Sequence, residues 1–142
     1  AASGGKFKVE AIRVDGPADL PTALARLTNR ADVLWSLNEP VVYNPETARS
    51  LLLFSLRNRI PLVGQSPAWV RAGALYALER DYDDVGAQCA YEALRILKGE
   101  AAATLPPAPP RKVRYALNQR TAAELQLTLT DAILHGAVEV VN

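Results

Sequence analysis

The sequence predicts an α/β fold with three layers, in which helices cover both faces of a mostly parallel sheet. Short apolar runs of strand length alternate with amphipathic helical segments, and the connections between them are short. A chain of 142 residues with 49% hydrophobic side chains is also large enough for one domain with its own core. Because parallel sheets bind ligands at the carboxyl ends of their strands, the loops after the strands are the first places to search for a site.

Five strands are expected along the chain. Residues 7–14 alternate apolar and polar side chains, as a strand near a sheet edge does. Residues 32–37 and 60–63 are short apolar runs that are typical of buried strands. Residues 73–78 and 112–117 complete the expected set.

The expected helices begin and end at recognisable signals. Asn44 followed by Pro45 gives a cap and a proline at the first helical position. Gly99 closes a long helix that begins at an acidic segment, and Thr121 with Glu124 predicts a capping box. The predicted helices are residues 19–29, 44–59, 68–72 and 81–98, with a further helix from 121 and a last amphipathic segment after it.

Composition excludes several classes of protein. Sixteen Lys and Arg balance fifteen Asp and Glu, which disfavours electrostatic binding of nucleic acid. The sequence has no apolar stretch near the roughly 20 residues that span a bilayer. The single Cys89 excludes an internal disulfide framework. The sequence contains no Met, so we expect an N-terminus made by processing, either signal-peptide removal or loss of an upstream domain.

Catalytic and cofactor signatures are missing from the sequence. It contains no G-x-S-x-G, no G-x-G-x-x-G and no Walker lysine loop. His135 is expected at a helix end, and Cys89 as a small buried hydrophobe. The acidic residues at 81, 83 and 84 are expected to be a solvated helix start rather than a metal site. We therefore expect no enzyme activity, no cofactor and no metal.

Two loops at predicted strand ends carry side chains suited to a ligand. Glu39 follows an apolar strand and is flanked by Asn38 and Pro40. A carboxylate in that position suits a ligand ammonium group, although an exposed loop glutamate is an equal alternative. Trp69 lies on the loop after the next strand, where its ring would either close over a ligand or pack in the core.

A series of short motifs, in this order and spacing, is similar to a known family. Residues 31–35 read ADVLW and lead to Glu39-Pro40 and Asn44, which resembles the family pattern aDalW…D-P…N. The further matching motifs are residues 59–63, 70–75, Asp81-Tyr82 with Gly86, residues 96–99, and Leu117-Asn118 with Thr121-Ala122. Together they resemble the ABC-transporter substrate-binding proteins whose better-known members take up aromatic amino acids.

The resemblance implies a Rossmann-like lobe of the type I periplasmic-binding-protein fold. It implies that residues 1–100 form the C-terminal ligand-binding lobe, that the Ala- and Pro-rich residues 101–110 form a linker, and that residues 111–142 form a closing tail. The N-terminal lobe would be absent. Ligand-binding residues would be Asn38, Glu39 and Pro40 with Ser66, Pro67 and Trp69; Glu39 stands where the family usually has Asp, and the loop with Ser66 has no acid.

The function implied is a non-catalytic solute-binding component of an ABC transporter, periplasmic or membrane-anchored. Its partners would be a small solute, such as an amino acid, and the transporter permease. The alternatives are a periplasmic sensor partner, the effector-sensing half of a transcription regulator and, least favoured, a Rossmann-like enzyme. A lone lobe exposes apolar surface, so we also predict a homodimer or a tail exchanged between copies.

Overall fold

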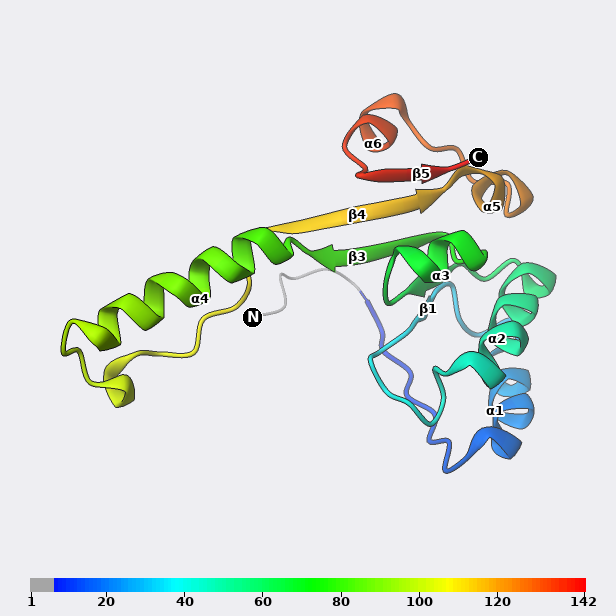
Figure 1. The fold of residues 1–142 in the computed structure, drawn as a ribbon. Helices are drawn as coiled ribbons and strands as arrows, with labels where there is room; N and C mark the ends of the chain where they lie inside the picture. The colour runs from blue at the N-terminus through cyan, green and yellow to red at the C-terminus, as the bar shows by residue number, and fades with distance from the viewer. Residues whose placement is uncertain (1–6) are drawn as a thin grey trace. The chain divides into compact units, whose positions relative to one another are not determined.

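The computed structural model describes residues 7–142. Residues 1–6, where the processed terminus is expected, lie outside the described residues. The chain divides into two compact units, residues 1–63 and residues 64–142. Figure 1 shows the fold and labels the α-helices and most of the strands.

The first unit packs two helices and the start of the sheet around a small apolar core. Its elements are η1 (Pro17–Asp19), α1 (Leu20–Leu27), β1 (Leu34–Trp35), α2 (Pro45–Asn58) and β2 (Leu62–Gly64), whose last residue already belongs to the second unit. Strands β1 and β2 are parallel, with Leu34 opposite Leu62 and Trp35 opposite Val63. The buried apolar side chains are Leu20, Ala23, Leu24, Leu34, Leu51, Ile60 and Leu62.

The second unit contains a three-stranded part of the sheet. Its elements are α3 (Pro67–Ala72), β3 (Tyr76–Arg80), α4 (Tyr82–Leu97), η2 (Ala102–Thr104), β4 (Val113–Asn118), α5 (Gln119–Glu124), α6 (Asp131–His135) and β5 (Glu139–Val141). Val70, Ala77 and Ala116 form the centre of its core. Two buried polar side chains connect α3 to this core by hydrogen bonds. Asn118 Nδ2 donates to the Val70 carbonyl oxygen at 2.8 Å, and Thr121 Oγ1 donates to the Gly73 carbonyl oxygen at 3.1 Å.

The predicted α/β class with a mostly parallel sheet is confirmed. The pairs β1–β2 and β4–β5 are parallel, whereas β3 and β4 are antiparallel. The antiparallel pair has a simple cause: the chain leaves β3 through α4, returns beside α4, and enters β4 in the opposite direction (Figure 1).

The long helices lie where their capping signals predict them. The Asn44 side chain accepts hydrogen bonds from the backbone amides of Glu46 and Thr47, so α2 begins with a full capping box. The Asp81 side chain accepts from the amide of Asp84 at the start of α4. Gly99 adopts φ of 99° just after α4, a conformation that favours glycine.

Four sequence predictions are wrong in detail. Residues 7–14 form no strand, because the alternating side chains find no partner strand: Phe7 is 92% and Val9 88% exposed. The expected strand 73–78 begins later, as β3. Asn118, rather than Thr121 with Glu124, caps α5, and its carbonyl oxygen accepts from the Thr121 amide at 2.8 Å. Cys89 is exposed rather than buried.

None of the helices in the described part of the chain combines the length and the apolar character that a bilayer crossing requires.

Candidate functional site

The predicted site residues belong to two segments, one in each unit. Asn38, Glu39 and Pro40 lie on the loop after β1 in the first unit. In the second unit Ser66 precedes α3, and Pro67 and Trp69 lie in the first turn of α3, so the prediction that Trp69 is a loop residue is wrong. Because β1 and β2 are parallel, the loop after β1 starts at the carboxyl edge of the pair, where α/β sheets bind ligands.

The loop after β1 is held at both ends by hydrogen bonds within the first unit. At its start, the buried Ser36 donates twice to the Val63 carbonyl, from its amide at 3.1 Å and from Oγ at 2.6 Å. At its end, Asn44 Nδ2 donates to the carbonyls of Pro40 and Val41 at 2.9 and 3.1 Å. The helix cap of α2 therefore also fixes the backbone of the loop.

The Glu39 side chain is oriented by the turn that follows it. Its carboxylate accepts hydrogen bonds from the amides of Val41 at 2.8 Å and Val42 at 2.9 Å. An ionised carboxylate has about four lone-pair sites, so about two remain for a further donor. Glu39 is half-buried, whereas Asn38 and Pro40 are exposed. The arrangement is a fixed anionic group at a strand end, which suits binding of a cation.

Tyr43 lies close to Glu39, and Trp35 ends the strand that precedes it; sequence reasoning missed both. Tyr43 donates a hydrogen bond from its hydroxyl to the Trp35 carbonyl at 3.3 Å. Burial, and then the negative charge of Glu39, raise the pKa of Tyr43 above its usual value. The Trp35 side chain is 67% exposed although it ends a strand. The sequence positions of these two residues could have indicated them, because Trp35 ends β1 and Tyr43 follows Glu39 by four residues.

The segment that follows β2 in the second unit, and enters α3 at Pro67, is closely packed. A Cβ on Gly64 would lie 2.5 Å from the Trp69 Cβ, so Trp69 requires glycine at this position. Trp69 is half-buried, and its carbonyl accepts from the Ala74 amide at 2.8 Å. Ser66 precedes α3 and makes no side-chain cap, while Pro67 is the first residue of that helix. These contacts favour a packing role for Trp69.

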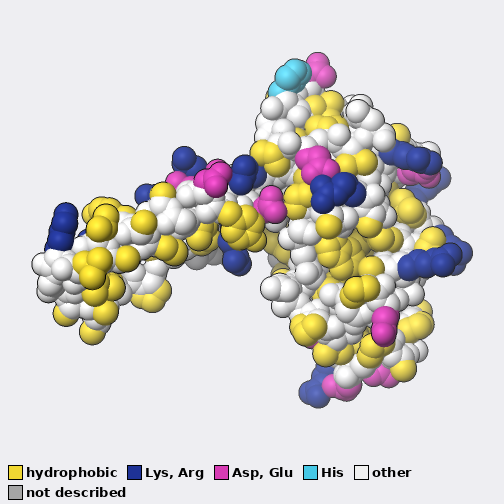
Figure 2. Space-filling view, viewed as in Figure 1, with side chains coloured by type: hydrophobic (Ala, Val, Ile, Leu, Met, Phe, Trp, Pro, Cys, Tyr) yellow, Lys and Arg dark blue, Asp and Glu magenta, His cyan; other side chains and the backbone are white. Residues whose placement is uncertain are grey.

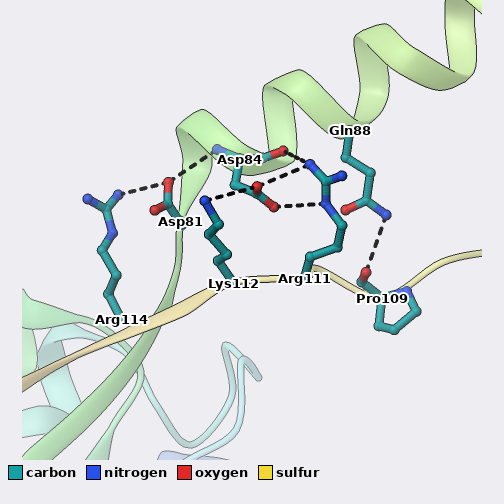
Figure 3. A network of polar contacts seen from close by, with 7 residues as sticks. All are labelled: Asp81, Asp84, Gln88, Pro109, Arg111, Lys112 and Arg114. Atoms are coloured by element: carbon teal, nitrogen blue, oxygen red, sulfur yellow. Dashed lines mark hydrogen bonds and ion pairs between the residues drawn. The ribbon is translucent and has the colours of Figure 1, made fainter.

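Acidic side chains at the start of α4 form hydrogen bonds and ion pairs with other residues of the chain. Asp81 caps the helix, and the Asp84 carboxylate bonds to Arg111 at 3.1 Å and lies 3.6 Å from Lys112 (Figure 3). Between residues 7 and 142, no group of three or more His, Cys, Asp or Glu side chains is placed to hold a metal ion. His135 is exposed at the end of α6, as predicted, with Nδ1 2.7 Å from the Asp131 carbonyl.

A polar hollow of about 430 Å³ lies elsewhere in the first unit. It is lined by residues 29–32 and 58–60, which precede β1 and β2. It is therefore at the amino ends of these strands, away from Glu39, and also next to the carboxyl ends of α1 and α2. We place the candidate site at Glu39 because the geometry of parallel sheets favours the other edge.

Comparison with known proteins supports the architecture. The family model described as ABC transporter substrate binding protein matches residues 2–141. No curated protein sequence matches the chain.

Three solved structures are similar to the chain in fold. A substrate-binding protein with adhesive properties from Clostridium difficile, in a ligand-free open form, has a TM-score of 0.71 at 19% identity, covering 96% of this chain and 45% of its own. An ABC domain in complex with L-Trp, from Streptococcus pneumoniae, has a TM-score of 0.69 at 20% sequence identity. The match covers 95% of this chain and 45% of that one. A conserved domain protein from Vibrio cholerae has a TM-score of 0.63 at 23% sequence identity. The match covers 88% of this chain and 42% of that one. The chain thus spans less than half the length of each.

Proposed function

The chain belongs to the family of ABC transporter substrate-binding proteins, and we propose that it forms one lobe of a non-catalytic protein that binds a small solute for a membrane permease. The family match over residues 2–141 carries this proposal. The α/β fold, with loops at the carboxyl ends of parallel strands, agrees with a binding role. The protein would work outside the cytoplasm, free or anchored to the membrane.

The ligand we propose is a small solute with an ammonium group and an apolar body, such as an amino acid. Glu39 supplies the anionic partner, because its carboxylate is fixed by two backbone amides and keeps capacity for another donor. Trp35, the last residue of β1, is exposed and would supply an apolar ring at the start of the same loop. Asn38 and Pro40 flank Glu39 on the same loop and would line the same site. Ser66 and Pro67, at the start of α3 in the second unit, remain separate candidates for ligand contact, whereas the contacts of Trp69 favour packing.

The test is a binding screen of the full-length protein against amino acids, small peptides and purines. Thermal shift identifies the ligand class, and titration calorimetry then gives Kd. Glu39→Gln keeps the size of the side chain and removes the charge, so binding of an ammonium ligand should weaken about 10- to 100-fold, the range expected for one charge-assisted hydrogen bond.

Glu124→Gln is the matched control, because Glu124 is an exposed carboxylate on α5 in the other unit. It should leave Kd unchanged. A ligand whose Kd is the same for the wild type and Glu39→Gln would remove Glu39 from the site. A screen with no ligand in any class would contradict the solute-binding function and favour a sensor partner.

A further inference from the structure

The turn between Glu39 and α2 contains two peptide groups that are hydrogen-bonded at both ends. The first joins Pro40 to Val41, and its N–H donates to Glu39 Oε1 at 2.8 Å. The second joins Val41 to Val42, and its N–H donates to Glu39 Oε2 at 2.9 Å. The carbonyl oxygens of the same two peptide groups accept from Asn44 Nδ2 at 2.9 and 3.1 Å. One side-chain amide therefore contacts both peptide groups that orient the carboxylate.

The oxygen end of the Asn44 amide is held by α2. Asn44 Oδ1 accepts hydrogen bonds from the backbone amides of Glu46 at 2.9 Å and Thr47 at 3.1 Å. A reversed amide would place its NH2 group against these two N–H donors, so the contacts allow only one orientation of the side chain. Asn44 thus connects the first turn of α2 to the Glu39 carboxylate through two peptide groups.

Thr47 repeats the arrangement one peptide group later. Its hydroxyl donates to the Val42 carbonyl oxygen, and the N–H of the same peptide group, that of Tyr43, donates to the Glu39 carbonyl oxygen at 3.1 Å. Thr47 is 4% exposed, so this contact lies away from water. Three successive peptide groups are therefore held between the start of α2 on one side and Glu39 on the other.

Holding a peptide group at both ends strengthens its contact with Glu39. Hydrogen bonds in a chain polarise one another, so a carbonyl that accepts from Asn44 makes the N–H of its peptide group a better donor. Figure 2 shows acidic side chains at separate places on the face in view, rather than gathered in one patch. A single carboxylate binds a cationic group more tightly when it is already oriented, because less side-chain entropy is lost on binding.

We propose that Asn44 is a positioning residue for the Glu39 carboxylate and contributes to ligand affinity only through Glu39. The effect on affinity rests on the proposed function, since Glu39 must contact the solute. The positioning of the carboxylate needs no ligand. Asn44 then has two separable roles, because Oδ1 caps α2 and Nδ2 holds the turn.

Asn44→Ser and Asn44→Asp separate these two roles. Ser and Asp cap helices about as well as Asn does. An ionised Asp has no donor, and Ser has one short hydroxyl in place of two N–H donors, so neither replaces the contacts of Nδ2. Circular dichroism should therefore show the helix content of the wild type in both variants.

The first test uses no ligand. Hydrogen exchange followed by NMR reports the amides of Val41 and Val42 individually. Both should exchange about 3- to 10-fold faster in Asn44→Ser than in the wild type, the range expected for loss of one ordinary hydrogen bond. The amides in the middle of α2 should be unchanged, because the cap is retained. Unchanged exchange at Val41 and Val42 would overturn the proposal.

The second test measures Kd in the full-length protein, for the solute that gives the largest thermal shift among amino acids, small peptides and purines. Asn44→Ser should weaken binding about 3- to 10-fold. Asn44→Asp should weaken it further, because its charge also repels the carbonyl oxygens of Pro40 and Val41. A side chain that only capped α2 would tolerate Asp, so wild-type affinity in Asn44→Asp, where Glu39→Gln weakens binding, would overturn the proposal.

The same substitution in the Glu39→Gln protein tests whether Asn44 acts through Glu39. In that background Asn44→Ser should change Kd by less than about twofold, because the two residues act as one unit. An equal loss in both backgrounds would overturn the proposal. If Glu39→Gln alone leaves Kd unchanged, the proposed site fails, and the exchange of Val41 and Val42 still decides whether Asn44 positions the carboxylate.

Asp81→Ser is the matched control. Asp81 caps α4 in the second unit, where its side chain accepts from the Asp84 amide at 3.1 Å. The substitution therefore makes the same kind of change to a helix cap outside the turn. It should leave both Kd and the exchange of Val41 and Val42 as they are in the wild type.

Discussion

Helices α2 and α4 begin in the same way and end in different surroundings. Each has a capping side chain, Asn44 for α2 and Asp81 for α4. Yet α2 buries Leu51 and Ser55 in the core of its unit, while α4 buries nothing. Caps and periodicity thus specify where a helix forms. They do not specify what covers its apolar face, which depends on the rest of the assembly.

The largest expected difference between the two helices is in the response to leucine truncation. Leu51 is 2% exposed, so Leu51→Ala should lower the free energy of unfolding by about 2–4 kcal/mol. Leu97 is 82% exposed, so Leu97→Ala should change it by less than about 0.5 kcal/mol in dilute solution. Urea unfolding at low micromolar concentration measures both. Equal losses would mean that the face of α4 is covered within a single chain.

A smaller effect of the opposite sign, a gain in stability, is expected for a substitution at Gly86. A Cβ added there meets no atom within 4 Å in the single chain. Gly86→Ala should therefore stabilise α4 by about 0.5–1 kcal/mol in dilute solution, as measured by hydrogen exchange of its amides. A loss of stability in Gly86→Ala would contradict this prediction, because the added methyl group would then meet a neighbour within the chain.

Local signals in the sequence predicted the helices well. Asn44-Pro45 and Gly99 mark boundaries that the structure confirms. The errors concern interactions between distant residues. Residues 7–14 carry a strand pattern but find no partner, and Cys89 lies among small residues that resemble a core. The antiparallel pairing of β3 with β4 likewise depends on residues far apart in sequence.

For the candidate site as well, the sequence predicted local position but not the contacts made in the folded loop. The position of Glu39 after β1 followed from strand patterning. Its fixed orientation depends on the amides of Val41 and Val42, and no side-chain pattern reports backbone hydrogen bonds of this kind. The contribution of Tyr43 depends on its hydroxyl reaching the Trp35 carbonyl, which only the folded loop brings about.

Hydrogen exchange of the chain in dilute solution tests the contrast between α2 and α4 most directly. The amides of α2 should be strongly protected, because this helix buries Leu51 and Ser55 in the core of its unit. The amides of α4 should exchange more readily, because no residue of α4 is buried. Protection of α4 equal to that of α2 would contradict this contrast, because the apolar face of α4 would then be covered within a single chain.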